Sequence, residues 1–133
     1  MGRIRGLAEV LLFVRDMERS LAFYRDLLGL TVISPEGLPA VFLRAGEERD
    51  GLPQQIVLVP RLPNARPAAT TKEERDLHHT GLEVAADEYA AERERIVQRG
   101  ISIRGGQHPF LPVEAFYLDD PDGNEVEIVA RMG

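Results

Sequence analysis

The first half of the chain begins with an apolar run and continues with an apolar stripe at helical spacing. Residues 8–14 have the sequence Ala-Glu-Val-Leu-Leu-Phe-Val, which predicts a strand. Asp16 is placed to cap a helix that ends at Gly29. The stripe recurs at i, i+4, i+7 and i+11 and consists of Met17, Leu21, Tyr24 and Leu28. Three further strands are predicted after this helix, at residues 30–34, 40–44 and 54–59.

The second half repeats this order of elements after a polar stretch that contains several prolines. A strand is predicted at 77–84, and a helix capped by Asp87 and ended by Gly100 follows it. Three more strands are predicted at residues 101–103, 115–119 and 125–130. In this repeat Glu9 corresponds to His79. The matching order predicts a duplicated β-α-β-β-β unit.

Two such units predict an α+β fold in which two short sheets share a cupped interior, because neither sheet alone could bury its outer face. We expect a single domain over 1–133, with one module at about 7–60 and the other at about 77–131. The linker between them, at about 61–76, is expected to lack secondary structure.

The composition is that of an ordinary globular domain and excludes several classes of protein. Hydrophobic residues make up 44% of the chain and charged residues 29%. The absence of cysteine excludes disulfides and thiolate metal ligands and is compatible with the cytoplasm. No apolar run approaches the roughly 20 residues of a membrane-spanning helix. A net charge of −6 argues against nucleic acid as a partner. We therefore expect a cytoplasmic protein that binds neither nucleic acid nor membranes.

Two motifs resemble those of a known superfamily. The first is Val14-x-Asp16-x-x-x-Ser20-Leu21-x-Phe23-Tyr24-x-x-x-Leu28-Gly29-Leu30. The second is His79-x-x-Leu82-x-Val84 followed by Asp120-Pro121-Asp122-Gly123-Asn124-x-x-Glu127. Together they resemble the signature of the vicinal oxygen chelate superfamily, which includes glyoxalase I, extradiol dioxygenases, fosfomycin-resistance enzymes and bleomycin-resistance proteins. The resemblance implies paired β-α-β-β-β modules that form an open cup, and it leaves the reaction open.

The resemblance also implies a divalent metal ion held by residues from the first and last strands of the modules. The positions of this chain that match such ligands are Glu9, His79, Glu127 and, in members with four ligands, Val57. Members commonly carry histidine at the position of Glu9, and Val57 cannot bind a metal. One imidazole and two carboxylates suit Fe(II), Mn(II), Ni(II), Zn(II) or Mg(II).

Each candidate ligand also has a structural interpretation. Because side chains alternate along a strand, Glu9 is expected to face the cup, where it needs a metal or an arginine, unless it lies in solvent at the mouth. His79 has His78 beside it on the opposite face, and a histidine is more often structural than a ligand; we expect His79 to bind the ion rather than His78. Glu127, aimed by a hairpin turn at Asp120–Asn124, is alternatively a solvated carboxylate.

Two further residues are candidate catalytic groups. Tyr117 lies three residues before Asp120, where the extradiol dioxygenases that this chain resembles have an active-site tyrosine. His108 lies nine residues before Tyr117, near the place of an acid–base histidine in those enzymes. Such a histidine could move protons, and the tyrosine could hydrogen-bond to a substrate oxygen. Alternatively, His108 is a loop residue and Tyr117 packs in the core.

These features predict a small metal-dependent enzyme that chelates a small substrate through vicinal oxygens. Dioxygenase-like chemistry is favoured, and glyoxalase-type lyase or isomerase chemistry is the runner-up. The alternative is a metal-free small-molecule binding protein like those of bleomycin resistance, because an acidic chain suits a cationic ligand. No arginine cluster is evident as an anchor for glutathione or coenzyme A. Sheet edges that need cover predict a homodimer.

Overall fold

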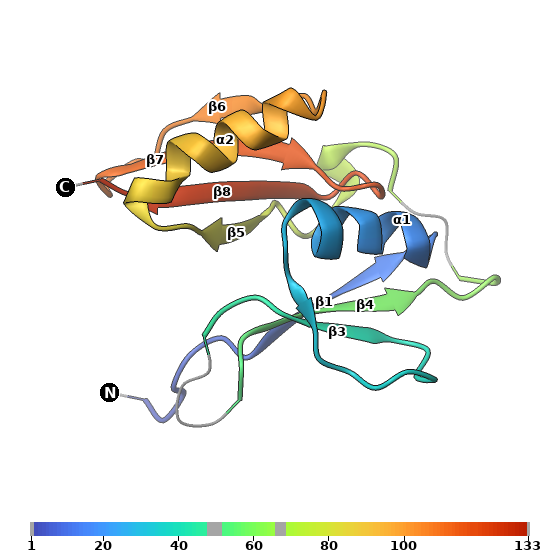
Figure 1. Ribbon diagram of the computed structural model, residues 1–133. Coiled ribbons are helices and arrows are strands. Elements are labelled where there is room, and N and C mark those ends of the chain that lie inside the picture. The colour runs from blue at the N-terminus through green and yellow to red at the C-terminus, as the bar shows by residue number, and fades with distance from the viewer. Residues whose placement is uncertain (1, 48–51, 66–68, 133) are drawn as a thin grey trace. The chain divides into compact units, whose positions relative to one another are not determined.

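The chain folds into two compact units, which the computed structural model describes over residues 2–47, 52–65 and 69–132. Unit 1 is Met1–Arg66 and unit 2 is Pro67–Gly133. Each unit contains a mixed sheet of four strands (Figure 1). The predicted α+β class with two repeated modules is confirmed.

Unit 1 has its elements in the predicted order. They are β1 (Glu9–Val14), α1 (Met17–Leu21), the π-helical turn η1 (Ala22–Leu27), β2 (Thr31–Val32), β3 (Val41–Arg44) and β4 (Gln55–Pro60). The sheet order is β1-β4-β3-β2, with β1 parallel to β4 and the other pairs antiparallel. Asp16 caps α1 as predicted, because its side chain accepts a hydrogen bond from Arg19 N–H at 3.3 Å. Gly29 follows the helical segment with φ +79°, a conformation that favours glycine.

Unit 2 repeats the arrangement with short helical turns added. Its elements are η2 (Lys72–Glu74), β5 (Thr80–Glu83), η3 (Ala86–Glu88), α2 (Tyr89–Gln98), β6 (Arg104–Gly106), β7 (Val113–Asp119) and β8 (Glu125–Arg131). The sheet order is β5-β8-β7-β6, with β5 parallel to β8 and the other pairs antiparallel. None of the helices in the described residues is long and apolar enough to cross a lipid bilayer.

Two local predictions for unit 2 are wrong. Asp87 does not cap α2, because it lies inside the turn η3 and the residue before the helix is Glu88, which makes no side-chain cap. The strand predicted at 101–103 lies at 104–106 instead. The side chains of Ile101 and Ile103 are half-buried, so this apolar pattern reflects packing and not strand pairing.

The segment expected to be an unstructured linker is partly structured. Lys72–Glu74 forms the 3-10 turn η2, and Lys72 pairs with Glu125 of β8 at 2.5 Å. Residues 66–68 of this segment lie outside the described residues. The C-terminal part of the segment therefore belongs to unit 2.

The sheet of unit 1 has one buried face toward its helix. On β1, Leu12 and Val14 are buried, whereas Leu11 and Phe13 are 54% and 58% exposed. Helix α1 packs against β4, whose Leu58 is completely buried. This alternation places Glu9 on the face of Leu11 and Phe13, as the sequence predicts.

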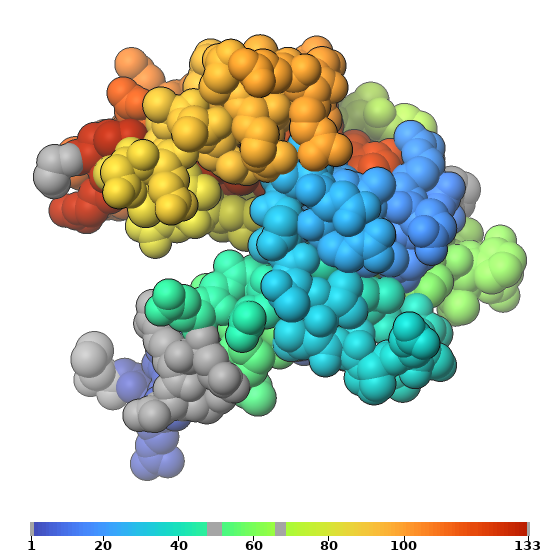
Figure 2. All heavy atoms as spheres, in the orientation of Figure 1, coloured from blue at the N-terminus to red at the C-terminus, as the bar shows by residue number. Residues whose placement is uncertain are grey.

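Helix α2 covers one face of the sheet in unit 2 (Figure 1). The Tyr89 ring contacts Phe116 of β7 with ring centroids 5.6 Å apart, and Ile96 is completely buried. In Figure 2 the yellow-to-orange residues of η3 and α2 form the outer layer of this unit. The opposite face of the sheet carries polar side chains, namely Tyr117 and Asp119 of β7 and Glu125 and Glu127 of β8.

Candidate functional site

The candidate site is built on three neighbouring strands of unit 2. Strand β5 places Gly81 opposite Glu127 of β8, and β7 places Tyr117 opposite Glu127 from the other side. His79 immediately precedes β5. A Cβ atom at Gly81 would lie 3.0 Å from Glu127 Oε1, so glycine leaves the space that the carboxylate occupies.

The predicted hairpin turn fixes the register of β7 and β8. Buried Asp120 accepts hydrogen bonds from the N–H groups of Asp122 at 2.9 Å and Asn124 at 2.8 Å. The Asn124 side chain donates a third, at 3.0 Å. Gly123 has φ +81°, which residues with a side chain rarely adopt. This turn holds Glu125 and Glu127 on the same face of the sheet.

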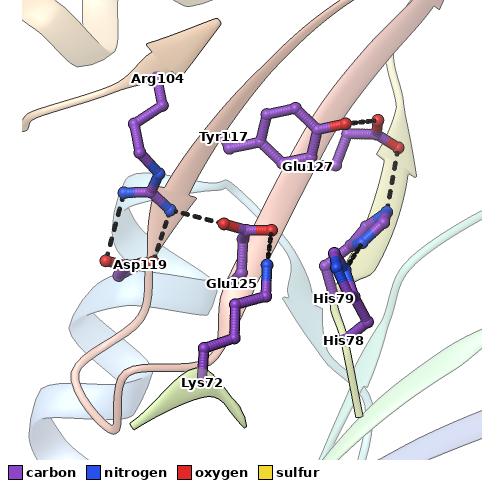
Figure 3. Close-up of polar contacts among 8 residues, drawn as sticks. All are labelled: Lys72, His78, His79, Arg104, Tyr117, Asp119, Glu125 and Glu127. Atoms are coloured by element: carbon purple, nitrogen blue, oxygen red, sulfur yellow. Dashed lines mark hydrogen bonds and ion pairs between the residues drawn. The ribbon is translucent and has the colours of Figure 1, made fainter. Parts of the chain in front are cut away.

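Glu127 joins a histidine and a tyrosine (Figure 3). Its Oε1 lies 3.7 Å from His79 Nε2, and its Oε2 accepts a hydrogen bond from the Tyr117 hydroxyl at 2.6 Å. The rings of His79 and Tyr117 meet edge to face, with centroids 5.6 Å apart. The structure therefore brings together His79, Glu127 and Tyr117, which the sequence predicts as site residues.

The hydrogen bond to Glu127 changes the acidity of Tyr117. Together with burial and the negative charge of the carboxylate, it raises the pKa of Tyr117 to about 12. Ionising the hydroxyl would remove the donor and place two negative charges side by side. Tyr117 is therefore a neutral hydrogen-bond donor at neutral pH.

His78 contacts His79, although sequence reasoning favoured only the latter as a functional residue. The two Nδ1 atoms are 2.8 Å apart, a hydrogen-bonding distance, so one ring donates and the other accepts. When the proton lies on His79 Nδ1, the lone pair of His79 Nε2 faces Glu127. A histidine that binds a metal through one nitrogen commonly donates from the other.

The other two predicted residues have their own surroundings. Glu9 begins β1 of unit 1 opposite Gln55, and its side chain is exposed; its role as a ligand stays a prediction. His108 lies in the loop before β7, where its Nδ1 accepts hydrogen bonds from Leu111 N–H at 2.9 Å and Phe110 N–H at 3.2 Å. Only Nε2 of the neutral ring then carries a proton. The acid–base role of His108 also stays a prediction.

Glu125 is a potential ligand that sequence reasoning missed. His78, His79 and Glu125 each have a potential ligand atom, and these three atoms lie within 4.8 Å of one another. The three residues therefore form a second group able to hold a cation. The sequence does contain a signal for Glu125: it lies two residues before Glu127, and this spacing in a strand places both carboxylates on one face of the sheet.

The surroundings of Glu125 make it a poorer metal ligand than Glu127. Its oxygens accept hydrogen bonds from Lys72 Nζ at 2.5 Å and from Arg104 at 2.9 Å. Burial alone would raise the pKa of Glu125, but these two cations outweigh it and lower the pKa. The same cations repel a metal ion, whereas Glu127 contacts a tyrosine hydroxyl and an imidazole.

The His79–Glu127 pair fits part of a divalent metal centre. Zinc-type ions bind nitrogen and oxygen ligands at about 2.0–2.2 Å, so two ligands of one ion lie roughly 3–3.5 Å apart. The observed separation of 3.7 Å is close to this value, and the side chains are only 31% and 13% exposed. A catalytic ion of this kind commonly has three protein ligands, and Glu9 is the predicted third.

A pocket of about 380 Å³ opens at His78 and Glu125, which neighbour His79 and Glu127 in the candidate site. It is lined by Thr70, Lys72, Arg75, His78, Arg104, Asp119, Gly123 and Glu125. Three of these side chains, those of Lys72, Arg75 and Arg104, are cationic and form a cluster that is not evident in the sequence. The sequence does not reveal the cluster, because Lys72 and Arg75 precede β5 and Arg104 lies on the edge strand β6, and only the fold brings them together.

Two mixed sheets of the same order and a His–Glu pair, with the histidine just before β5 and the glutamate on β8, define a two-module protein of the glyoxalase type. Residues 6–128 match the Glyoxalase/Bleomycin resistance protein/Dioxygenase superfamily. The chain belongs to this superfamily, as the resemblance of its two motifs implies.

Known proteins show how far the similarity extends. A catechol-2,3-dioxygenase of Bacillus subtilis (strain 168) is 30% identical over 123 residues, which are 90% of this chain and 39% of that protein. The chain thus spans well under half of this relative. A glyoxalase/dioxygenase of Nostoc punctiforme has a TM-score of 0.76 and 22% identity, covering 99% of this chain and 94% of the other.

A binding protein shares the fold as well. TnmS3, an antibiotic binding protein from Streptomyces sp. CB03234, has a TM-score of 0.65 and 21% identity, covering 99% of this chain and 100% of the other. At identities near 20% both structural comparisons establish the fold, and a fold of this kind supports several functions.

Proposed function

We propose that this protein is a small metal-dependent enzyme with dioxygenase-like activity on a substrate that chelates the ion through vicinal oxygens. The observation that carries the proposal is the His79–Glu127 pair, with Tyr117 hydrogen-bonded to the carboxylate. Similarity to the catechol-2,3-dioxygenase of Bacillus subtilis supports this chemistry over a lyase or isomerase. The lack of a fourth ligand at Val57 supports it too.

His79, Glu127 and Glu9 would hold the ion, which would be Fe, Mn, Ni, Zn or Mg. A bound divalent ion supplies Lewis-acid stabilisation of negative charge on substrate oxygens and, as Fe(II), can activate O₂. Glu127 presents Oε1 to His79 because its Oε2 is held by Tyr117. His78 supports the His79 tautomer that leaves Nε2 unprotonated.

Tyr117 would donate a hydrogen bond to the substrate, and His108 would transfer a proton. With its pKa raised to about 12, Tyr117 keeps its proton and can turn its O–H from Glu127 to a substrate oxygen. His108 would exchange a proton at Nε2, because its Nδ1 is occupied by backbone N–H donors. We further propose that the protein acts in the cytoplasm as a homodimer, which would cover sheet edges.

A second candidate function is metal-free binding of a small molecule. Glu9 stands where superfamily members commonly have histidine, as expected if the metal centre has been lost. The shared fold with the antibiotic binding protein TnmS3 is compatible with this function.

Metal analysis of protein purified without chelator separates the two functions. If the protein is the proposed enzyme, the wild type should contain one divalent ion per chain. The Glu127→Ala and His79→Ala variants should contain none. Glu114→Ala is the matched control, because Glu114 is an exposed carboxylate of β7 whose position in the strand alternates with that of Tyr117. Wild-type protein without bound metal, but with saturable binding of a small molecule, would favour the binding protein. Oxygen uptake with catechol tests the reaction itself.

A further inference from the structure

We propose that the pocket beside the His79–Glu127 pair binds an anionic group, a carboxylate or a phosphate, of a small-molecule ligand. The pocket lies between the segment around η2, the edge strand β6 and the β7–β8 turn. Its volume of about 380 Å³ is within the usual range of small-molecule sites. The anion site consists of residues of unit 2 alone and requires no metal.

Lys72 and Arg104 approach the pocket from different elements and share one carboxylate (Figure 3). Lys72 pairs with Glu125 at 2.5 Å, and Arg104 pairs with Glu125 at 2.9 Å and with Asp119 at 2.7 Å. The Glu125 side chain is 15% exposed, whereas that of Asp119 is 52% exposed. Exposed ion pairs contribute little stability, so a ligand anion can replace Asp119 at Arg104 at small cost.

Arg75 adds a positive charge that its hydrogen bonds do not neutralise. Its guanidinium donates to three neutral oxygens, which are Asn124 Oδ1 at 3.1 Å, Ala69 O at 3.2 Å and Asp122 O at 2.9 Å. A Cβ atom at Gly123 would lie 2.8 Å from Arg75 Nη2, so glycine makes room for this arginine. These contacts fix the guanidinium before a ligand arrives, which lowers the entropic cost of binding.

The charges of the pocket favour an anion over a cation. Three cationic side chains, Lys72, Arg75 and Arg104, line it together with two carboxylates, Asp119 and Glu125. The pocket is therefore positive although the whole chain carries a net charge of −6. Two guanidinium groups and an ammonium around one cavity are suited to carboxylate or phosphate oxygens.

The pocket also connects to the candidate metal pair. His78 lines it and contacts His79 at 2.8 Å. A ligand whose anionic group is held by the cations would thus extend toward His79 and Glu127. If the proposed function holds, on which this last step rests, the substrate is an organic acid or a phosphate ester.

Titration of metal-stripped protein with inorganic phosphate and with acetate tests the anion site. The chelator is removed first, and ionic strength is kept constant with chloride because exposed charges are screened by salt. Backbone amide NMR signals of Thr70 and Gly123, two residues that line the pocket, are expected to shift saturably. The anion that saturates at the lower concentration identifies the group.

Variants that change the charge of the pocket should change its affinity for the anion. Lys72→Gln and Arg104→Gln should each weaken anion binding at least about threefold, and Asp119→Asn should strengthen it by a similar factor because it releases Arg104. Arg95→Gln is the matched control. Arg95 pairs with Glu92 on α2 and does not line the pocket, and its side chain is 40% exposed against 46% for Arg104.

The proposal is overturned if neither anion shifts the Thr70 and Gly123 signals saturably, or if Lys72→Gln, Arg104→Gln and Asp119→Asn all bind the anion as the wild type does. These results are independent of metal binding. A protein that binds the anion but no metal would disprove the proposed enzyme and leave the anion site standing. A protein that binds metal but no anion would disprove the anion site and leave the proposed enzyme standing.

Discussion

Tyr117 and Glu127 are direct partners across β7 and β8, and the tyrosine hydroxyl donates to the carboxylate at 2.6 Å. The Tyr117 ring lies over Gly106 of the edge strand β6, where a Cβ atom would overlap it. Glycine at position 106 therefore leaves the space that the Tyr117 ring occupies.

The hydrogen bond to Glu127 should make Tyr117 ionise at a higher pH than an ordinary tyrosine. In metal-stripped protein, its phenolate should form with a pKa of about 12, against an ordinary value of 10.0. The neutral form is favoured in the folded state, so the contribution of Tyr117 to stability is complete below pH 10 and is lost as the pH rises from 10 toward 12. Phenolate absorbance, with Tyr117→Phe to identify the transition, measures it. Glu127→Gln should return the pKa of Tyr117 toward 10.0; an unchanged pKa would contradict the assigned hydrogen bond.

Gly106→Ala should displace the Tyr117 ring and weaken its hydrogen bond to Glu127. We expect a loss of about 1–3 kcal/mol in the free energy of unfolding, the usual effect of overpacking. The pKa of Tyr117 should fall as well. Gly105→Ala is a close control, because an added Cβ meets nothing within 4 Å there. Urea unfolding and the phenolate titration check both effects, and equal behaviour of the two variants would refute the packing argument.

Asp120→Ala should destabilise the protein much more than Asp119→Ala. Asp120 is 5% exposed and accepts three hydrogen bonds within the turn, so its removal leaves three buried or half-buried N–H groups without this acceptor. We expect a loss of about 2–3 kcal/mol in the free energy of unfolding. Asp119 is exposed and pairs with Arg104, so its removal should cost less than about 1 kcal/mol. Urea unfolding of both variants gives the comparison.

The fold was largely predictable because local signals agree with the repeated order of elements. Asp16 caps α1, Gly29 follows the helical segment, and Gly123 occupies the turn that needs positive φ. Predictions failed where tertiary contacts override local pattern. Asp87 looks like a cap but lies in a 3-10 turn, and the apolar residues at 101–103 pack instead of pairing with β7.

The site was predictable only in part. The motifs pointed to His79, Glu127 and Tyr117, because strand register and turn spacing are encoded locally. The ion pairs that Lys72 and Arg104 make with Glu125 depend on how distant segments approach β8, which no local pattern records. Those same contacts show that Glu125, although it shares a face with Glu127, is held by cations.

The contact of His78 with His79 should affect metal affinity if His79 is a ligand of the proposed metal centre. His78→Ala removes the 2.8 Å contact that orients His79, so the affinity for Mn(II) or Zn(II) should fall about tenfold, the usual effect of losing such a partner. His79→Ala removes a ligand and should abolish binding. His108→Ala should leave the affinity unchanged, because the contacts of His108 are with its own loop. Competition with a metal-sensitive dye measures all three. Equal affinities in wild type and His78→Ala would show that His78 does not position His79, and equal losses in His78→Ala and His79→Ala would make His78 a ligand itself.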